Sequence, residues 1–276
     1  MSLLDLPNTI IAPINIQLPR GLKEISFDNF KIRKIQKEEK NLFLKHETIP
    51  SFYRSELQYT RWALVKNVIN MEEINSFHNE INYLRETLIL YKNKPINLFV
   101  FGALLKPLFL CVNHKYQFEH ISDSYPILNK DIKKIKILYD IIKSLHENSK
   151  DDLYKVVIER YQSALYVNTA FPNRFTDLVT ILEALCVKNN QGEYSFRLAI
   201  ILSLILYKKF RENKHEMYKN IKIFYKIRSE FVHSGTSRHC TKSSLNELLE
   251  ITRKIIFIYV NDPSFFKKED LIKELI

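Results

Sequence analysis

Arg228 and His233 have side chains suited to chemistry on a phosphodiester, and both lie in the segment FYKIRSEFVHSG, residues 224–235. A histidine titrates near neutral pH, so it can take up or release a proton during a reaction. An arginine offers a fixed fork of N–H donors that matches phosphate oxygens. The pair could cleave RNA through attack of a ribose 2′-hydroxyl on the adjacent phosphorus, leaving a 2′,3′-cyclic phosphate and a 5′-hydroxyl. This chemistry needs no metal ion, and DNA, which lacks the attacking hydroxyl, would not be cut.

The spacing of Arg228 and His233 decides how they could act together. Each residue of an α-helix turns by about 100° and rises about 1.5 Å, so these side chains lie about 140° apart and about 7.5 Å along the axis. They do not share one face of a regular helix. A two-fold interface would instead concentrate two arginines and two histidines in one groove. We therefore predict a composite site in a homodimer and an inactive monomer.

Helical periodicity dominates the chain from residue 129 onward and must position this pair. Apolar residues recur three and four positions apart in residues 131–146, 152–168, 172–188, 193–210 and 215–233. Gly235 is typical of the position just past a helix end, and Ser244 and Glu247 resemble a capping box that opens a sixth helix. Six helices joined by short loops predict an antiparallel bundle. The segment 193–210 is apolar almost all round and is expected to be the central, most buried helix.

Three separated segments precede Arg228 in a fixed order: residues 174–185 (RFTDLVTILEAL), 193–199 (EYSFRLA) and 224–227 (FYKI). In order and spacing they closely resemble the ApeA-like branch of the HEPN superfamily, over roughly residues 150–260. The resemblance implies a helical bundle that dimerises and a metal-independent endoribonuclease activity that uses no cofactor. It also implies that the motif arginine, here Arg228, and the motif histidine, here His233, are supplied by both protomers.

The resemblance assigns further, weaker roles. The position after the motif arginine is commonly Asn, Asp or His in the superfamily, and here it is Ser229, a poorer helper. Some HEPN toxins carry a tyrosine two positions after the histidine for modification by an antitoxin, and Gly235 stands there, so that regulation is not expected. Glu183 and Arg197 lie in the resembling segments and are candidates to order the site, or else members of structural ion pairs. Arg228 itself could simply be a solvated charge on the helix, or pair with Glu230 or Glu183.

The charge balance fits a polyanionic partner such as nucleic acid. The chain has a formal net charge of +11 and a pI near 9.3. Lys, Ile and Asn dominate the whole sequence, however, which is also typical of an AT-rich genome. A candidate contact for RNA phosphates, or else a solvated loop, is the basic cluster Lys208, Lys209, Arg211 and Lys214. With only four glycines, the chain has no P-loop and no dinucleotide-binding glycine motif.

The three cysteines are isolated, which predicts no disulfide framework and a reducing cytoplasm as the compartment. Cys111 and Cys186 lie in apolar runs and are expected in cores. His239 and Cys240 have no second pair at ligand spacing, so we expect no metal. The longest apolar runs are too short to span a bilayer and the first residues do not resemble a signal peptide, so no membrane partner is expected.

The N-terminal half gives mixed signals. The expected elements are a strand with a turn at Asp28–Asn29 in residues 25–35, a strand in 57–68, a helix in 71–91, and a buried strand in 98–112 that bends at Pro107. We predict a small α/β domain over residues 1–128, a linker at 122–126, and the helical bundle over 129–276. The fold class is therefore mainly α, with an α/β domain in front of the bundle.

The leading functional hypothesis is an endoribonuclease that acts as a toxin or as an antiviral, abortive-infection effector. The N-terminal domain would sense a trigger, restrain the nuclease or bind a regulatory partner. The defence role rests on the resemblance alone. The alternative is a non-catalytic HEPN module that binds RNA or nucleotide or scaffolds a partner, and a plain helical interaction domain is a third class.

Overall fold

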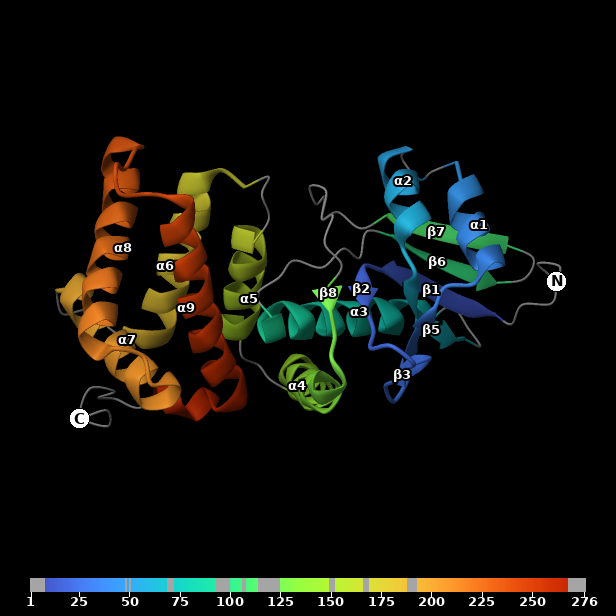
Figure 1. The fold of residues 1–276 in the computed structure, drawn as a ribbon, viewed down its shortest axis with the longest axis horizontal. Helices are drawn as coiled ribbons and strands as arrows, with labels where there is room; N and C mark the ends of the chain where they lie inside the picture. The colour runs from blue at the N-terminus through green and yellow to red at the C-terminus, as the bar shows by residue number, and fades with distance from the viewer. Residues whose placement is uncertain are drawn as a thin grey trace. The chain divides into compact units, whose positions relative to one another are not determined.

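The computed structural model describes residues 8–47, 49, 51–68, 72–92, 100–105, 108–113, 125–148, 152–165, 169–187 and 193–267. Two compact units divide the chain, Met1–Glu147 and Asn148–Ile276. The chain is mainly helical, and the described strands all belong to the first unit (Figure 1). Among the described residues, no helix combines the length and apolar character that crossing a membrane requires.

The first unit is built on a six-stranded antiparallel sheet of order β3-β4-β5-β1-β6-β7. Its strands are β1 (Thr9–Ile14), β3 (Glu24–Ser26), β4 (Lys31–Lys34), β5 (Trp62–Asn67), β6 (Val100–Leu105) and β7 (Leu108–Asn113). A separate parallel pair joins β2 (Ile16–Gln17) to β8 (Tyr125–Pro126). β1 lies inside the sheet between β5 and β6 and is buried along its whole length.

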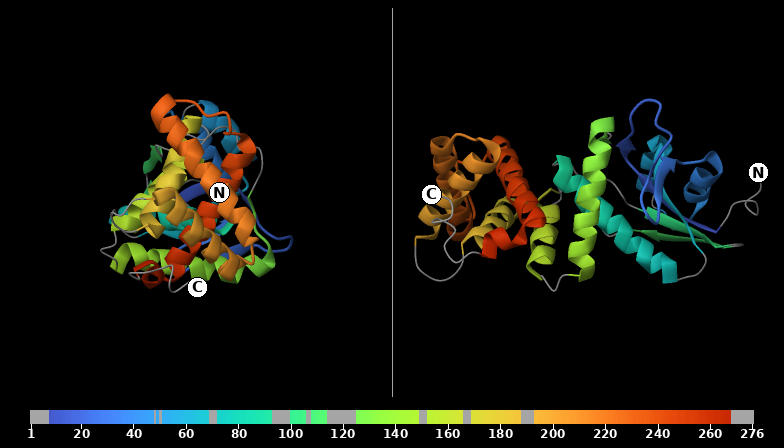
Figure 2. Two further views of the ribbon diagram at one scale, coloured as in Figure 1. Left: turned by 90° about the vertical axis from the view of Figure 1, so that its left-hand side faces the viewer. Right: turned by 90° about the horizontal axis from the view of Figure 1, so that it is seen from below.

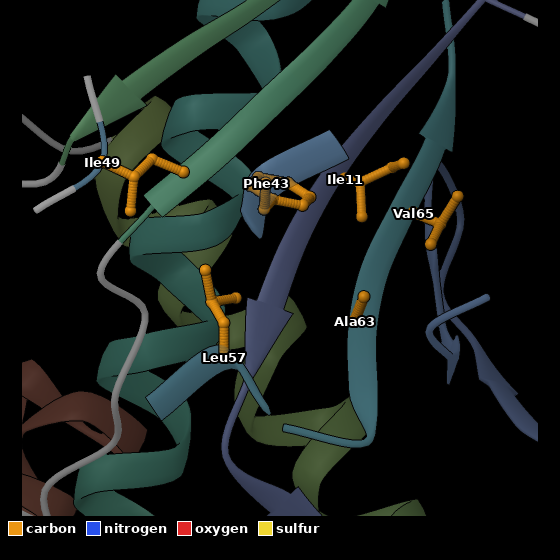
Figure 3. Close-up of a cluster of buried hydrophobic side chains, with 6 residues drawn as sticks. All are labelled: Ile11, Phe43, Ile49, Leu57, Ala63 and Val65. Atoms are coloured by element: carbon orange, nitrogen blue, oxygen red, sulfur yellow. The ribbon is translucent and has the colours of Figure 1, made fainter. Parts of the chain in front are cut away.

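Helices cover this sheet through apolar side chains. On one face, Phe43 of α1 (Lys37–Lys45) and Leu57 of α2 (Ser51–Tyr59) pack with Ile11, Ala63 and Val65 of the sheet (Figure 3). Alternate residues point to the opposite face of a strand, and those of β1, β4 and β5, namely Ile10, Ile32 and Leu64, are equally buried. α3 (Glu72–Lys92) contacts β1. The sheet is therefore buried on both faces.

The helix α4 (Asn129–Asn148) belongs, up to Glu147, to the first unit. Its Tyr139 ring lies edge-on to Phe27, at 5.0 Å between centroids. Asp131 accepts from Lys92 of α3 at 2.7 Å, and near the other end of α4 the His146 Nε2 atom lies 2.8 Å from a Glu86 carboxylate oxygen. The domain boundary thus falls after Glu147 instead of at 128, because α4 finds both its aromatic and its charged partners in the first unit.

Other expectations for the first half are met in part. Residues 25–35 form the hairpin β3–β4, and residues 71–91 correspond to α3. The strand expected in 57–68 is the end of α2 followed by β5, and the strand expected in 98–112 is the hairpin β6–β7. The linker expected at 122–126 is wrong at Tyr125, which is buried and donates its hydroxyl to the Leu88 carbonyl at 2.7 Å. Pro107 and residues 122–124 lie outside the described residues.

The second unit is a bundle of helices followed by a 3₁₀ turn, Pro263–Lys267 (Figures 1 and 2). Its helices are α5 (Asp152–Leu165), α6 (Phe171–Cys186), α7 (Tyr194–Phe210), α8 (Lys214–Ser234) and α9 (Lys242–Asn261). The apolar periodicity of the sequence therefore predicted these helices correctly, although α4, which was predicted as part of the bundle, belongs to the first unit. α6 contacts α5, α7, α8 and α9, whereas α7 packs mainly on α8. The apolar run of residues 193–210 is buried between Leu198 and Leu206 as expected, but the expectation that this helix is central is wrong, because α6 is the helix that contacts the other four.

The ends of α8 and α9 are set by short-range hydrogen bonds. The Asn213 side chain accepts from the backbone N–H groups of His215 and Glu216, which opens α8. Gly235 has φ 71° and closes α8 as predicted, with its N–H donating to the Phe231 carbonyl. α9 opens with a capping box between Thr241 and Ser244, so the cap expected at Ser244 lies three residues too late.

Candidate functional site

Aromatic packing on α6 fixes the part of α8 that carries Arg228. The Phe175 ring of α6 meets Phe224 and Phe231 of α8 edge-to-face, at 6.0 and 6.2 Å between centroids. Phe224 and Ile227 are buried. Because Arg228 follows Phe224 by four residues, about one helical turn, its side chain emerges from the edge of this packed face.

Arg228 meets Glu183 of α6 at the edge of the bundle. The Arg228 Nη2 atom lies 3.8 Å from a Glu183 carboxylate oxygen, and the two side chains are 29% and 20% exposed. The guanidinium carbon lies 5.9 Å from the centre of the Tyr225 ring. A partly exposed pair at this separation contributes about 1 kcal/mol or less to stability. Glu183 therefore orients the guanidinium without consuming its whole fork of donors.

Tyr225 completes this cluster by bonding to the same carboxylate. Its hydroxyl hydrogen-bonds to Glu183, and burial followed by the Glu183 charge raises the pKa of Tyr225 above its ordinary value. The hydroxyl therefore stays protonated and acts as a donor. Tyr194, in the first turn of α7, is close enough to contribute to the same shift. We call Glu183, Tyr225 and Arg228 the arginine cluster.

Two arginines, one on α7 and one on α8, each have a donor without a partner in the part of the chain that the structure describes. The Nε atoms of Arg197 and Arg228 are buried and have no hydrogen-bond partner among the described residues. An unmet buried donor costs about 1–3 kcal/mol, and more when it is charged, so such groups call for an explanation. Within the described part of the chain, Arg197 forms no ion pair. Both guanidinium groups could serve an anion that approaches α7 and α8.

His233 lies in the last turn of α8 and is exposed. Its ring makes no hydrogen bond or ion pair with any described residue, and the structure shows no contact between it and Arg228. Val232 beside it is 56% exposed. The Glu230 carboxylate, on the same turn, accepts a hydrogen bond from the Ser237 hydroxyl and forms an ion pair with Lys226. The described residues of this chain therefore hold the arginine in place and give the histidine no polar partner.

Ser229 and the basic cluster stand apart from these contacts. Ser229 is half-buried, and no hydrogen bond of its side chain occurs among the described residues. The basic residues Lys208, Lys209 and Arg211 are exposed at the C-terminal end of α7. Lys214 opens α8, and 14 residues separate it from Arg228, about 21 Å along the helix. The structure therefore does not bring this cluster to the arginine cluster.

A pocket at the start of α7 was not predicted from the sequence. It has a volume of about 310 Å³ and is lined by Glu193, Ser195, Phe196 and Lys222. Phe196 is 46% exposed and meets Tyr218 of α8 edge-to-face at 6.4 Å. Helical periodicity by itself does not distinguish an exposed phenylalanine such as Phe196 from a core one. The available signal was that Phe196 precedes the buried run of α7, which begins at Leu198.

His, Cys, Asp and Glu side chains are those that could bind a metal ion, and cysteine side chains could also react as thiols. Nowhere in the described part of the chain do three or more His, Cys, Asp or Glu side chains come together as a metal site needs. Cys186 is buried as expected, and burial raises the pKa of its thiol, which makes it unreactive. The side chain of Cys111 lies outside the described residues.

Comparison of this chain with models of known protein families, with characterised proteins and with solved structures gives no match.

Proposed function

We propose that the second unit is a metal-independent endoribonuclease of the HEPN type, with Arg228 and His233 as its catalytic pair in a homodimer. The observation that carries the proposal is that one helix presents two groups: the partly buried guanidinium of Arg228, and the imidazole of His233 one to two turns further along. Among the described residues, neither the Arg228 Nε donor nor the His233 ring has a hydrogen-bond partner. These are the groups that cleavage through a 2′-hydroxyl needs. The order of the segments around them, which resembles the ApeA-like branch, supplies the expectation of RNA as the substrate.

The reaction would use two copies of each side chain. One neutral His233 takes the proton of the 2′-hydroxyl as its oxygen forms a bond to phosphorus. The bond between phosphorus and the 5′-oxygen breaks, and the second His233, in its protonated form, donates a proton to that leaving oxygen. Arg228 binds the non-bridging oxygens, whose negative charge increases in the transition state. The products are a 2′,3′-cyclic phosphate and a 5′-hydroxyl.

The dimer requirement is supported by the position of His233 on α8. The last turn of α8 ends at the Gly235 cap. The His233 imidazole cannot move to the helix face of Arg228 unless this turn unwinds and the capping hydrogen bond of Gly235 breaks. Val232, which is apolar and 56% exposed, offers a surface next to His233 that a second copy could cover. A two-fold axis beside the end of α8 would place each histidine near the other protomer's arginine cluster.

Glu183 and Tyr225 are proposed as positioning residues. The carboxylate holds the guanidinium from one side and is itself held by the Tyr225 hydroxyl. Bound phosphate would compete with Glu183 for the same donors, and the 3.8 Å separation makes that exchange easy. Arg197 is proposed as a further phosphate contact, because its Nε donor is unmet.

Purified full-length chain, incubated with RNA in EDTA, tests the proposal. Wild-type protein should cut RNA and leave termini that carry cyclic phosphate, while the Arg228→Ala and His233→Ala variants should not. Arg238→Ala and His239→Ala are matched controls, because these exposed residues lie close by and outside the proposed site. Equal cutting by His233→Ala and His239→Ala would refute the proposal. Binding of RNA by wild-type protein without cleavage would favour a non-catalytic HEPN module.

The cellular role is proposed on the resemblance alone. A toxin or antiviral effector would stop growth when its nuclease is released, and the first unit would restrain it or sense a trigger. Expression of wild-type chain should then slow growth, and expression of His233→Ala should not. The same pair tested with the second unit alone would show whether the first unit restrains activity.

A further inference from the structure

The pocket at the start of α7, which we call the α7 pocket, has the chemistry of a base-binding site. Phe196 presents an aromatic ring that is 46% exposed and is held edge-to-face by Tyr218. Bases of single-stranded RNA stack on such rings. A volume of about 310 Å³ lies at the lower end of the range for small-molecule sites, which suits one nucleobase.

The polar residues of the pocket add a cation and a carboxylate. Lys222 lies 5.8 Å above the Tyr218 ring and is otherwise exposed, so its ammonium group can reach a phosphate. Glu193 is exposed at the N-cap position of α7, where its backbone is left-handed with φ 54°. Among the described residues, no ion pair joins Glu193 to Lys222 or to any other cation. Both charges are therefore available to a ligand.

The α7 pocket and the arginine cluster lie on helices that pack together, the pocket on α7 and α8 and the cluster on α6 and α8. Tyr194 lies between Glu193 and Ser195, and it is close enough to Tyr225 to raise its pKa. On α8, Lys222 precedes Arg228 by six residues, about 9 Å along the axis. The two side chains also lie about 120° apart around that axis, so an RNA strand that occupies both places must curve partly around α8.

We propose that the α7 pocket binds an unpaired guanine of the RNA that the arginine cluster cleaves, an inference that rests on the proposed nuclease function. The guanine ring stacks on Phe196, and Lys222 contacts the phosphate. Ionised Glu193 only accepts hydrogen bonds, through two oxygens side by side. Guanine is the base whose Watson–Crick edge offers two adjacent donors, N1–H and the N2 amino group. Adenine, cytosine and uracil each place an acceptor next to a donor, so a carboxylate pairs with them less well.

Binding is measured apart from cleavage by blocking the attacking oxygen. The probes are fluorescein-labelled 2′-O-methyl oligouridines with one central guanosine or one central adenosine, and the readout is fluorescence anisotropy. Wild-type chain should bind the guanosine probe about fivefold or more tightly, the discrimination that a bidentate contact gives. Glu193→Gln should lose this preference and shift it toward adenosine, because an amide accepts and donates side by side.

Matched variants separate the pocket from general surface effects. Phe196→Ala should weaken both probes about fivefold or more through lost stacking. Tyr207→Ala should not, although Tyr207 lies on the same helix and is also 46% exposed. Lys222→Ala should weaken both probes, while Lys219→Ala on the same helix should change binding less.

Cleavage of unmodified RNA by the same proteins then distinguishes the two proposals. If RNA is cut and Phe196→Ala binds and cuts like Tyr207→Ala, the α7 pocket proposal is overturned and the nuclease proposal stands. If wild-type chain discriminates between the probes as expected but cuts no RNA, the pocket proposal stands as a binding site and the nuclease proposal fails. Equal affinity of wild-type chain for both probes overturns the guanine assignment in either case.

Discussion

Replacing Arg228 with lysine separates the proposed catalytic role of this residue from its contribution to stability. Lysine keeps the positive charge opposite Glu183 but replaces a planar fork of five donors with one flexible ammonium group. The ion pair spans 3.8 Å and both side chains are partly exposed, so the whole pair contributes about 1 kcal/mol or less. Because lysine retains most of the attraction, we expect the melting temperature to stay within about 2 °C of wild type.

The loss of activity should be much larger than the loss of stability. Removing one well-placed donor to transition-state charge lowers rates by about 100-fold or more in other enzymes, equivalent to about 2.7 kcal/mol. The assay is single-turnover cleavage of a labelled RNA in EDTA, combined with thermal denaturation of the same samples. The matched control is Arg160→Lys, because Arg160 pairs with Asp177 of α6 at 2.6 Å in the same unit. Similar rates for the two variants, or a rate that falls only as far as the folded fraction falls, would refute the assigned role.

Three further predictions concern the fold. Burial and the hydrogen bond to Asp131 raise the pKa of Tyr91 to about 12. The contribution of Tyr91 to the free energy of unfolding is therefore complete below pH 10 and is lost as the pH rises toward 12. Urea denaturation at several pH values across this range should show a smaller loss of stability for Tyr91→Phe than for wild type. Phe175→Ala removes the ring that joins α6 to α8 and should destabilise the second unit by about 3–5 kcal/mol in urea denaturation. Residues 148–276 should fold alone with a cooperative melt by circular dichroism, whereas 129–276, which adds a helix without its partners, should aggregate in size-exclusion chromatography.

The helices of the second unit could be predicted because their apolar spacing matches the helical repeat. Gly235 marked the end of α8 correctly, since its φ of 71° suits glycine best. The sequence could not identify α6 as the central helix. α7 has the longer apolar run. Which helix is central depends instead on which helices contact one another, and α6 contacts α5, α7, α8 and α9.

The first unit was harder to predict, because its sheet is buried on both faces. β1 is apolar without alternation, so it lacks the period of two that marks a half-exposed strand. α4 has ordinary amphipathic spacing, and only the positions of Phe27, Lys92 and Glu86 show which unit it joins. Periodicity thus identifies helices, but it does not identify the partners that bury them.

For the candidate site, the sequence offered Glu183 as one possible partner of Arg228, and the structure brings these two together. It gave no sign of Tyr225 as the third member, because a tyrosine on a helix is as often a core residue as a polar one. The exposed ring of Phe196 was missed for the same reason. Side chains at the ends of helices depend on which neighbour covers them, and this is decided by tertiary packing.

The way in which Arg228 and His233 are held supports a site shared between protomers. Arg228 is fixed from two sides by Glu183 and the Tyr225 ring, whereas His233, on the last turn of α8, makes no hydrogen bond or ion pair with a described residue. Joining them within one chain would require that turn to unwind, which breaks the hydrogen bond from Gly235 to Phe231 and disturbs the Phe231 ring on α6. Each lost hydrogen bond costs about 0.5–1.5 kcal/mol, before any loss of packing. A second copy can supply the histidine with α8 intact, so activity should rise with the square of protein concentration below the dimer dissociation constant.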